Sequence, residues 1–109
     1  RSSKGKCHMI NVIASIRVRE GRLQDFIAIF KANVPNVRAE SGCLEYVPTI
    51  DAPTGLPPQE LDKDVVTIIE KWDSVEALKV HLTAPHMRTY QERVRDMVEN
   101  VSIKILTEA

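Results

Sequence analysis

The sequence predicts a single α+β domain, and the chain length together with two kinds of periodicity indicates it. Of the 109 residues, 43% are apolar and 28% are charged, which fits one small globular domain. Period-two alternation over four segments predicts strands, and apolar residues at helical spacing between them predict helices. The predicted order is strand–helix–strand–strand–helix–helix–strand, a ferredoxin-like βαββααβ arrangement with a four-stranded antiparallel sheet.

The first strand and the helix after it have the clearest patterns. Residues 9–19 alternate between apolar and mostly polar side chains, which is typical of a strand, and Gly21 lies in the turn that follows. Apolar residues then recur on one helical face: Leu23, Phe26, Ile27, Phe30, Val34 and Val37. Because Pro35 has no amide proton, we expect this helix to kink or restart near Asn33 and to end at Gly42.

A second strand is predicted over residues 43–50, with Leu44, Tyr46 and Pro48 on one face. Proline cannot donate a hydrogen bond to a neighbouring strand, so Pro48 indicates an edge strand or a fraying strand end. Residues 51–63 contain three prolines and form a long loop. We expect this loop to be an arm over a partner subunit or over the mouth of a pocket.

The third strand is predicted over residues 64–72. One of its faces carries Val66, Ile68, Glu70 and Trp72. Either Asp73 or Ser74 can cap the short helix that follows, which runs to about Leu82.

A further helix and a fourth strand complete the pattern. We expect Thr83 to cap this helix, with Pro85 in its first turn, and Asn100 to end it. Its apolar face carries Met87, Tyr90, Val94, Met97 and Val98. The alternation of residues 101–106 predicts the fourth strand.

The predicted helices can cover only one face of the sheet. The other face carries Ile13, Val47 and further apolar residues of the third and fourth strands. An uncovered apolar face of this kind usually binds a partner. We therefore expect a homodimer.

Composition limits the classes of partner and the location. Fifteen basic and fifteen acidic residues give a formal net charge of zero, which argues against nucleic acid as a partner. No apolar run reaches the length of about 18 residues typical of a membrane span. Two cysteines, Cys7 and Cys43, cannot form a disulfide framework, so we expect a cytoplasmic protein. Residues 1–8 lack a pattern and are treated as a tail or an expression remnant, and residues 9–109 as one domain.

Six side chains are candidates for a site between the sheet and the helices. They are polar or aromatic groups able to move protons or donate hydrogen bonds, namely Asn33, Glu70, Trp72, His81, His86 and Tyr90. Histidine titrates near neutral pH, so His81 and His86 are the candidate acid–base residues, with His81 expected to matter more. Each candidate also has an ordinary structural interpretation, for example Trp72 as a core residue.

Other kinds of site have weaker support in the sequence. His81 and His86 lie five residues apart across a helix junction, unlike a pair of metal ligands on one helix face. The chain contains four glycines and no glycine-rich phosphate loop. A lone cysteine such as Cys43 is more often buried and inert than nucleophilic.

Three segments resemble the antibiotic biosynthesis monooxygenase family. They are residues 12–33, the run SGCLEY at 41–46, and the run EKWDSVEALKVHLTAPHM at 70–87. The resemblance implies a dimeric α+β barrel. It also implies oxidation of a quinol or polyphenol by dioxygen without a metal, flavin or haem cofactor. In that chemistry His81 or His86 would be the base, and Trp72, Tyr90 and Asn33 would shape the pocket.

Two alternative functions remain open at this point. Asn33, Glu70, His81, Pro85 and His86 also resemble positions of a related isomerase that acts on a small phosphorylated dione derived from the autoinducer-2 signal. The other alternative is a non-enzymatic barrel that binds a small molecule. An apolar cavity with both histidines favours the oxygenase, basic side chains in it favour the isomerase, and a filled pocket favours a binding or structural role.

Overall fold

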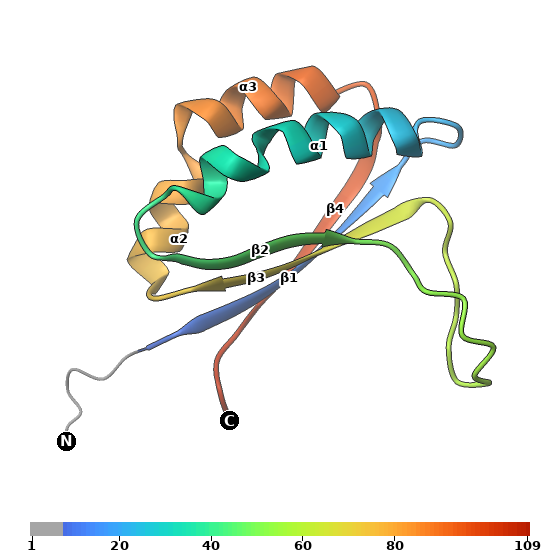
Figure 1. Cartoon of the computed structure of the whole chain (residues 1–109), viewed down its shortest axis with the longest axis horizontal. Coiled ribbons are helices and arrows are strands. Elements are labelled where there is room, and N and C mark those ends of the chain that lie inside the picture. The colour runs from blue at the N-terminus through green and yellow to red at the C-terminus, as the bar shows by residue number, and fades with distance from the viewer. Residues whose placement is uncertain (1–7) are drawn as a thin grey trace.

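The computed structural model describes residues 8–109, and its elements follow the predicted order (Figure 1). They are β1 (Ile10–Val18), α1 (Leu23–Arg38), β2 (Cys43–Thr49), β3 (Val65–Trp72), α2 (Val75–Leu82), α3 (Pro85–Val94) and β4 (Val98–Leu106). The proposed tail therefore lies outside the described residues, apart from His8.

The four strands form one antiparallel sheet in the order β2-β3-β1-β4. In the centre of the sheet Ile16 pairs with Val66 of β3 on one side and with Val101 of β4 on the other. Strands β2 and β4 are the two edges, so Pro48 lies in an edge strand as predicted.

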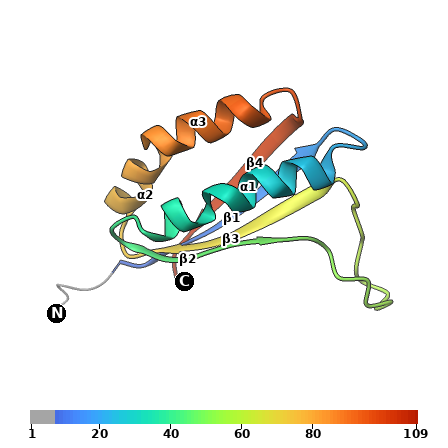
Figure 2. The same cartoon turned by 45° about the horizontal axis from the view of Figure 1, so that its top comes forward.

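All three helices lie on one side of the sheet (Figure 2). The predicted face of α1 is correct, because Phe26, Phe30, Val34 and Val37 are buried. The alternation predicted for β3 is also correct, since Val66, Ile68, Glu70 and Trp72 are buried on the helix side. Ser74 caps α2 by accepting a hydrogen bond from the backbone N–H of Ala77 at 3.1 Å.

Two local predictions in the first half are wrong. The predicted restart of the first helix does not occur, because α1 is continuous through Pro35, while the predicted kink stays a prediction. Proline has no N–H to donate to the carbonyl group four residues before it. Because Pro35 is exposed, that carbonyl group can bind water instead. Leu44 does not share a face with buried Tyr46, because the β2–β3 register shifts between Cys43 and Glu45 and leaves Leu44 exposed.

The boundary between the last helix and the last strand also differs from the prediction. Thr83 is the C-cap of α2, and its hydroxyl lies 3.3 Å from the carbonyl oxygen of Val80, while Ala84 precedes α3. Helix α3 ends at Val94, and Asn100 lies inside β4. The helix was predicted too long because Met97 and Val98 continue its apolar stripe. In the structure Met97 lies in the turn after α3, and Val98 begins β4.

Strand β4 has little cover in the single chain. The helices pack mainly over β2 and β3. Val101, Ile103 and Ile105 pair with residues of β1 that are buried on the helix side, yet they are 46–57% exposed. On the opposite face of the sheet Val47 and Ile69 are also exposed.

The loop between β2 and β3 extends beyond the end of the sheet (Figure 1). Asp62 of this loop forms an ion pair with Arg17 of β1, and Gln59 donates a hydrogen bond to the carbonyl oxygen of Ala52 at 2.8 Å. Within residues 8–109, no helix has the length and apolarity needed to cross a membrane.

Candidate active site

A small cavity lies between the sheet and the helices, on the side of β4. We call it the inner cavity, and its volume is about 250 Å³. Most of its lining is apolar, including Ile68, Met87, Val94 and Ile103. The polar residues of the lining are Tyr46, Glu70, His81, Tyr90, Gln91 and Arg95. The loop at residues 51–63 contributes nothing to this lining, so in the single chain it does not cover the cavity mouth.

His81 is the histidine of the inner cavity, and only 2% of it is exposed. It lies on the last turn of α2, with its ring centroid 4.7 Å from that of Trp72 and 5.4 Å from that of Tyr46. Burial lowers the pKa of His81 below the ordinary value of 6.5, and the nearby Glu40 carboxylate opposes this effect only in part. The ring is therefore neutral at pH 7 and able to accept a proton.

Glu40 joins the two histidines, and sequence analysis missed it. It lies in the turn after α1, with its side chain 12% exposed. Its Oε2 is 3.1 Å from Nδ1 of His81 and 2.7 Å from Nε2 of His86. Only the His81 contact has the direction of a hydrogen bond. No periodicity marks Glu40, because its partners lie more than forty residues further along the chain.

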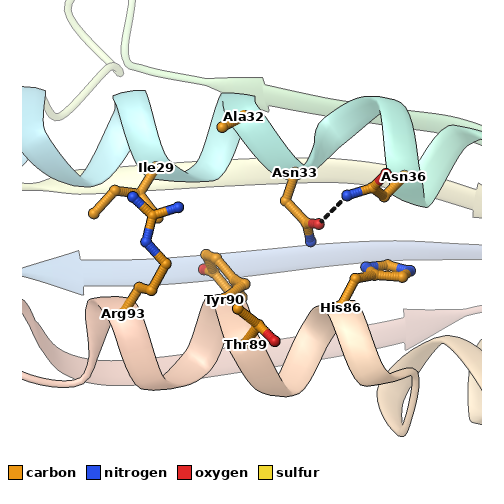
Figure 3. Close-up of a pocket in the computed structure, with 8 residues that line it drawn as sticks. All are labelled: Ile29, Ala32, Asn33, Asn36, His86, Thr89, Tyr90 and Arg93. Atoms are coloured by element: carbon orange, nitrogen blue, oxygen red, sulfur yellow. Dashed lines mark hydrogen bonds between the residues drawn. The ribbon is translucent and has the colours of Figure 1, made fainter.

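His86 lines a different depression, which we call the outer groove. This groove lies between α1 and α3 and has a volume of about 220 Å³ (Figure 3). Its lining residues are Ile29, Ala32, Asn33, Asn36, His86, Thr89, Tyr90 and Arg93. His86 belongs to the first turn of a new helix that starts at Pro85. The structure therefore brings His81, but not His86, to the inner cavity.

Asn33 and Tyr90 lie between α1 and α3 (Figure 3). The amide nitrogen of Asn33 lies 3.4 Å from the sulfur of Met87, and its oxygen accepts a hydrogen bond from Asn36 at 3.0 Å. Tyr90 lines both the outer groove and the inner cavity, so its ring forms part of the wall between them. Burial raises the pKa of Tyr90 above its ordinary value, so its hydroxyl keeps its proton at neutral pH.

Glu70 and Trp72 form a buried pair on β3. The Trp72 indole N–H donates a hydrogen bond to Glu70 Oε1 at 2.9 Å. Burial raises the pKa of Glu70, and the bond from Trp72 opposes this shift. Glu70 lines the inner cavity, whereas Trp72 is fully buried and contacts the His81 ring.

Two further side-chain chemistries have little support in the geometry. Burial raises the pKa of the Cys43 thiol, which makes its thiolate scarce at neutral pH. Among residues 8–109, the structure has no group of three or more His, Cys, Asp or Glu side chains arranged to hold a metal ion.

The fold and the site define a class of protein: a small ferredoxin-like α+β protein with an apolar cavity and a histidine–carboxylate pair beside it. The profile described as "Antibiotic biosynthesis monooxygenase" matches residues 9–93, and the chain belongs to this family. This membership confirms the resemblance found in the sequence. It identifies the chain as a monooxygenase of that family.

A relative of known sequence belongs with this family by name, and solved structures share the fold. The chain is 39% identical over 100 residues to "Probable quinol monooxygenase YgiN" of Escherichia coli K12, covering 90% of this chain and 96% of the relative. It is similar to the crystal structure of PA3566 from Pseudomonas aeruginosa, with 25% identity, a TM-score of 0.79, and 94% and 95% of the two chains covered. Rv0793 from Mycobacterium tuberculosis shares the fold, with 24% identity, a TM-score of 0.77, and 93% and 95% covered.

Proposed function

We propose that this chain oxidises a quinol or a related polyphenol with dioxygen in the inner cavity. The observation that carries the proposal is a neutral, buried histidine at an apolar cavity, hydrogen-bonded to a carboxylate. A cavity of about 250 Å³ is small for a ligand site and suits one or two fused rings. The name of the 39% identical relative gives the same substrate class.

The proposed reaction balances without an external reductant. The quinol loses a proton, and the resulting anion is electron-rich enough to reduce dioxygen. One oxygen atom forms a new C–O bond on the ring and replaces a hydrogen, while the O–O bond breaks and the other atom leaves as water. The quinol supplies all four electrons and becomes a hydroxyquinone, so no metal or flavin is needed in this scheme.

The side chains of the cavity have distinct roles in this proposal. Nε2 of His81 accepts the phenolic proton, while its Nδ1–H donates to Glu40 and fixes the tautomer. Tyr90 and Gln91 are donors that stabilise the phenolate oxygen. The apolar lining keeps water away from the reactive anion. Trp72 holds the His81 ring in place through a tilted ring–ring contact.

We also propose that the chain acts as a homodimer. Half-exposed apolar residues of β4, such as Val101 and Ile103, border the inner cavity, so a second subunit over this strand would close the mouth. A stable interface of this kind buries more than about 1,000 Å². Light scattering at micromolar concentration should give twice the chain mass of 12.3 kDa, and a monomer would contradict the proposal.

The predicted role of the 51–63 loop as an arm over the partner is tested by whether deleting residues 54–61 weakens the dimer.

The alternatives make different demands on the inner cavity. A phosphorylated dione needs basic groups for its phosphate, and Arg95 is the single lysine or arginine in the cavity lining. The cavity meets the expectation for the oxygenase only in part, because it contains His81 but not His86. Its mainly apolar lining, with one basic side chain, still supports the oxygenase over the isomerase. The cytoplasmic location expected from the sequence stays a prediction.

An oxygen electrode with a panel of hydroquinones and naphthohydroquinones tests the proposal. Oxygen uptake above the enzyme-free rate should match hydroxyquinone formation one to one, and ¹⁸O₂ should place one labelled atom in each product molecule. Isomerisation of a phosphorylated dione without oxygen uptake would overturn the proposal in favour of the isomerase. Quinol binding without turnover would overturn it in favour of a binding protein.

A further inference from the structure

The inner cavity and the outer groove are joined by one carboxylate. Oε2 of Glu40 lies 3.1 Å from Nδ1 of His81, which lines the cavity, and 2.7 Å from Nε2 of His86, which lines the groove. A base that is 2% exposed cannot pass its proton directly to bulk water. The groove between α1 and α3 is open to solvent.

The His86 ring has an unusual environment. Both of its nitrogens are buried without a well-directed hydrogen bond, although a quarter of the side chain is exposed. The exposed atoms are therefore carbons. A half-turn about the Cβ–Cγ bond exchanges ring carbons with ring nitrogens, and it breaks no well-formed hydrogen bond. Buried polar groups without partners are rare in folded proteins, so this arrangement needs an explanation.

We propose that Glu40 and His86 carry the proton taken up by His81 out to the groove. The His86 ring rotates between an inward orientation beside Glu40 and an outward orientation toward solvent. This inference rests on the proposed function, because it assigns the exit path for the proton that the substrate loses.

Each transfer conserves protons and charge. The substrate hydroxyl gives its proton to Nε2 of His81, and Nδ1 of His81 releases its own proton to Oε2 of Glu40. The carboxyl group then passes that proton from the same oxygen to Nε2 of His86. After the ring rotates, His86 releases a proton to water, and Glu40 is again a carboxylate. When the second oxygen atom leaves, the path runs inward: Nε2 of His81 gives its proton to that oxygen, which leaves as water, and Nδ1 takes a proton back from solvent through His86 and Glu40. This return restores the Nδ1–H tautomer of His81, so the whole cycle releases no net proton. Glu40 and His86 act through His81 and do not touch the substrate.

Chemical rescue of His86→Ala distinguishes this path from a structural role. At low buffer concentration kcat should fall by about tenfold or more with KM unchanged, a smaller loss than removal of the base itself. Added imidazole should restore kcat in proportion to its concentration, since it replaces the missing ring in the groove. Wild type and the control Thr89→Ala, one helical turn away in the same groove, should not respond to imidazole.

Two further measurements test the exit path. Glu40→Gln keeps the shape of the side chain but cannot accept and pass on a proton, so its kcat should fall and imidazole should not rescue it. Spectra of ¹⁵N-histidine at neutral pH should show His81 as the Nδ1–H tautomer, a readout that needs no activity. The Nε2–H tautomer, or full kcat of His86→Ala at low buffer, or a loss that imidazole does not relieve, would overturn the exit path.

The failures of the two proposals can be told apart. If the wild type oxidises quinols but the rescue is absent, the exit path is wrong and the proposed function stands. If the wild type oxidises no quinol, the proposed function is wrong, and the exit path fails with it because there is then no substrate proton to carry.

Discussion

Replacement of His81 separates the chemistry of its ring from its packing. His81→Phe keeps an aromatic ring against Trp72 and Tyr46 but removes both nitrogens. His81→Ala removes the packing as well. If His81 is the base, both variants should lose about 10²- to 10⁴-fold in kcat, which corresponds to about 3–5 kcal/mol of transition-state stabilisation.

The stability of the two variants should differ. His81→Ala loses two aromatic contacts and leaves space in the core, so its free energy of unfolding should fall by roughly 2–4 kcal/mol. His81→Phe should lose less stability, because its ring keeps the aromatic contacts. The loss that remains comes mainly from Glu40, which no longer has its hydrogen-bond partner. The assays are oxygen uptake with an active hydroquinone and urea unfolding of the same preparations.

If His81→Phe kept kcat within threefold of wild type, His81 would not be the base, whatever its effect on stability. If the two variants lost activity only in proportion to their unfolded fractions, the ring would have a packing role alone.

Three further predictions concern stability and pH. Gly42→Ala should cost roughly 2–4 kcal/mol in denaturant unfolding, because Gly42 has φ +88° and an added Cβ would lie 2.6 Å from that of Ala77. Gly21→Ala is the matched control, with φ +84° and no atom within 4 Å, and an equal loss there would contradict the steric argument. Ser74→Ala should cost about 1 kcal/mol by removing the side-chain cap of α2, and an unchanged midpoint would show that water replaces the cap. The pKa of His81 is lower in the folded state, so on acidification the unfolded chain takes up the proton first. The contribution of His81 to stability is therefore present above pH 6.5 and is lost as the pH falls through the folded-state pKa. Acidification below pH 6.5 should therefore destabilise the wild type more than His81→Phe, and parallel pH profiles would contradict the assigned shift.

The fold was predictable where one periodicity acts alone. Strands β1 and β3 alternate because one face of each packs under the helices, and the face of α1 repeats every three or four residues for the same reason. The end of α3 was not predictable, since Met97 and Val98 satisfy both the helical and the strand period. The bulge at Leu44 depends on how two strands pair, which a single segment does not encode.

The candidate site was predictable only in part. His81 and Glu70 follow from the strand and helix patterns that place them beneath the helices. Glu40 carries no local pattern, because its role depends on a turn that meets two helices much later in the chain. His86 was expected beside His81, but the helix junction at Ala84 and Pro85 places it in the outer groove.

The register between β1 and β4 has a consequence for the order of folding. Ile16 of β1 pairs with Val101, so two neighbouring strands come from opposite ends of the described chain. During synthesis β1 can pair with β3 before β4 has left the ribosome. The other edge of β1 is unpaired during that time. Pairings between distant segments close slowly, so the last strand should also be the last to dock. Until it docks, the open edge of β1 is the part of the sheet most exposed to pairing with another chain.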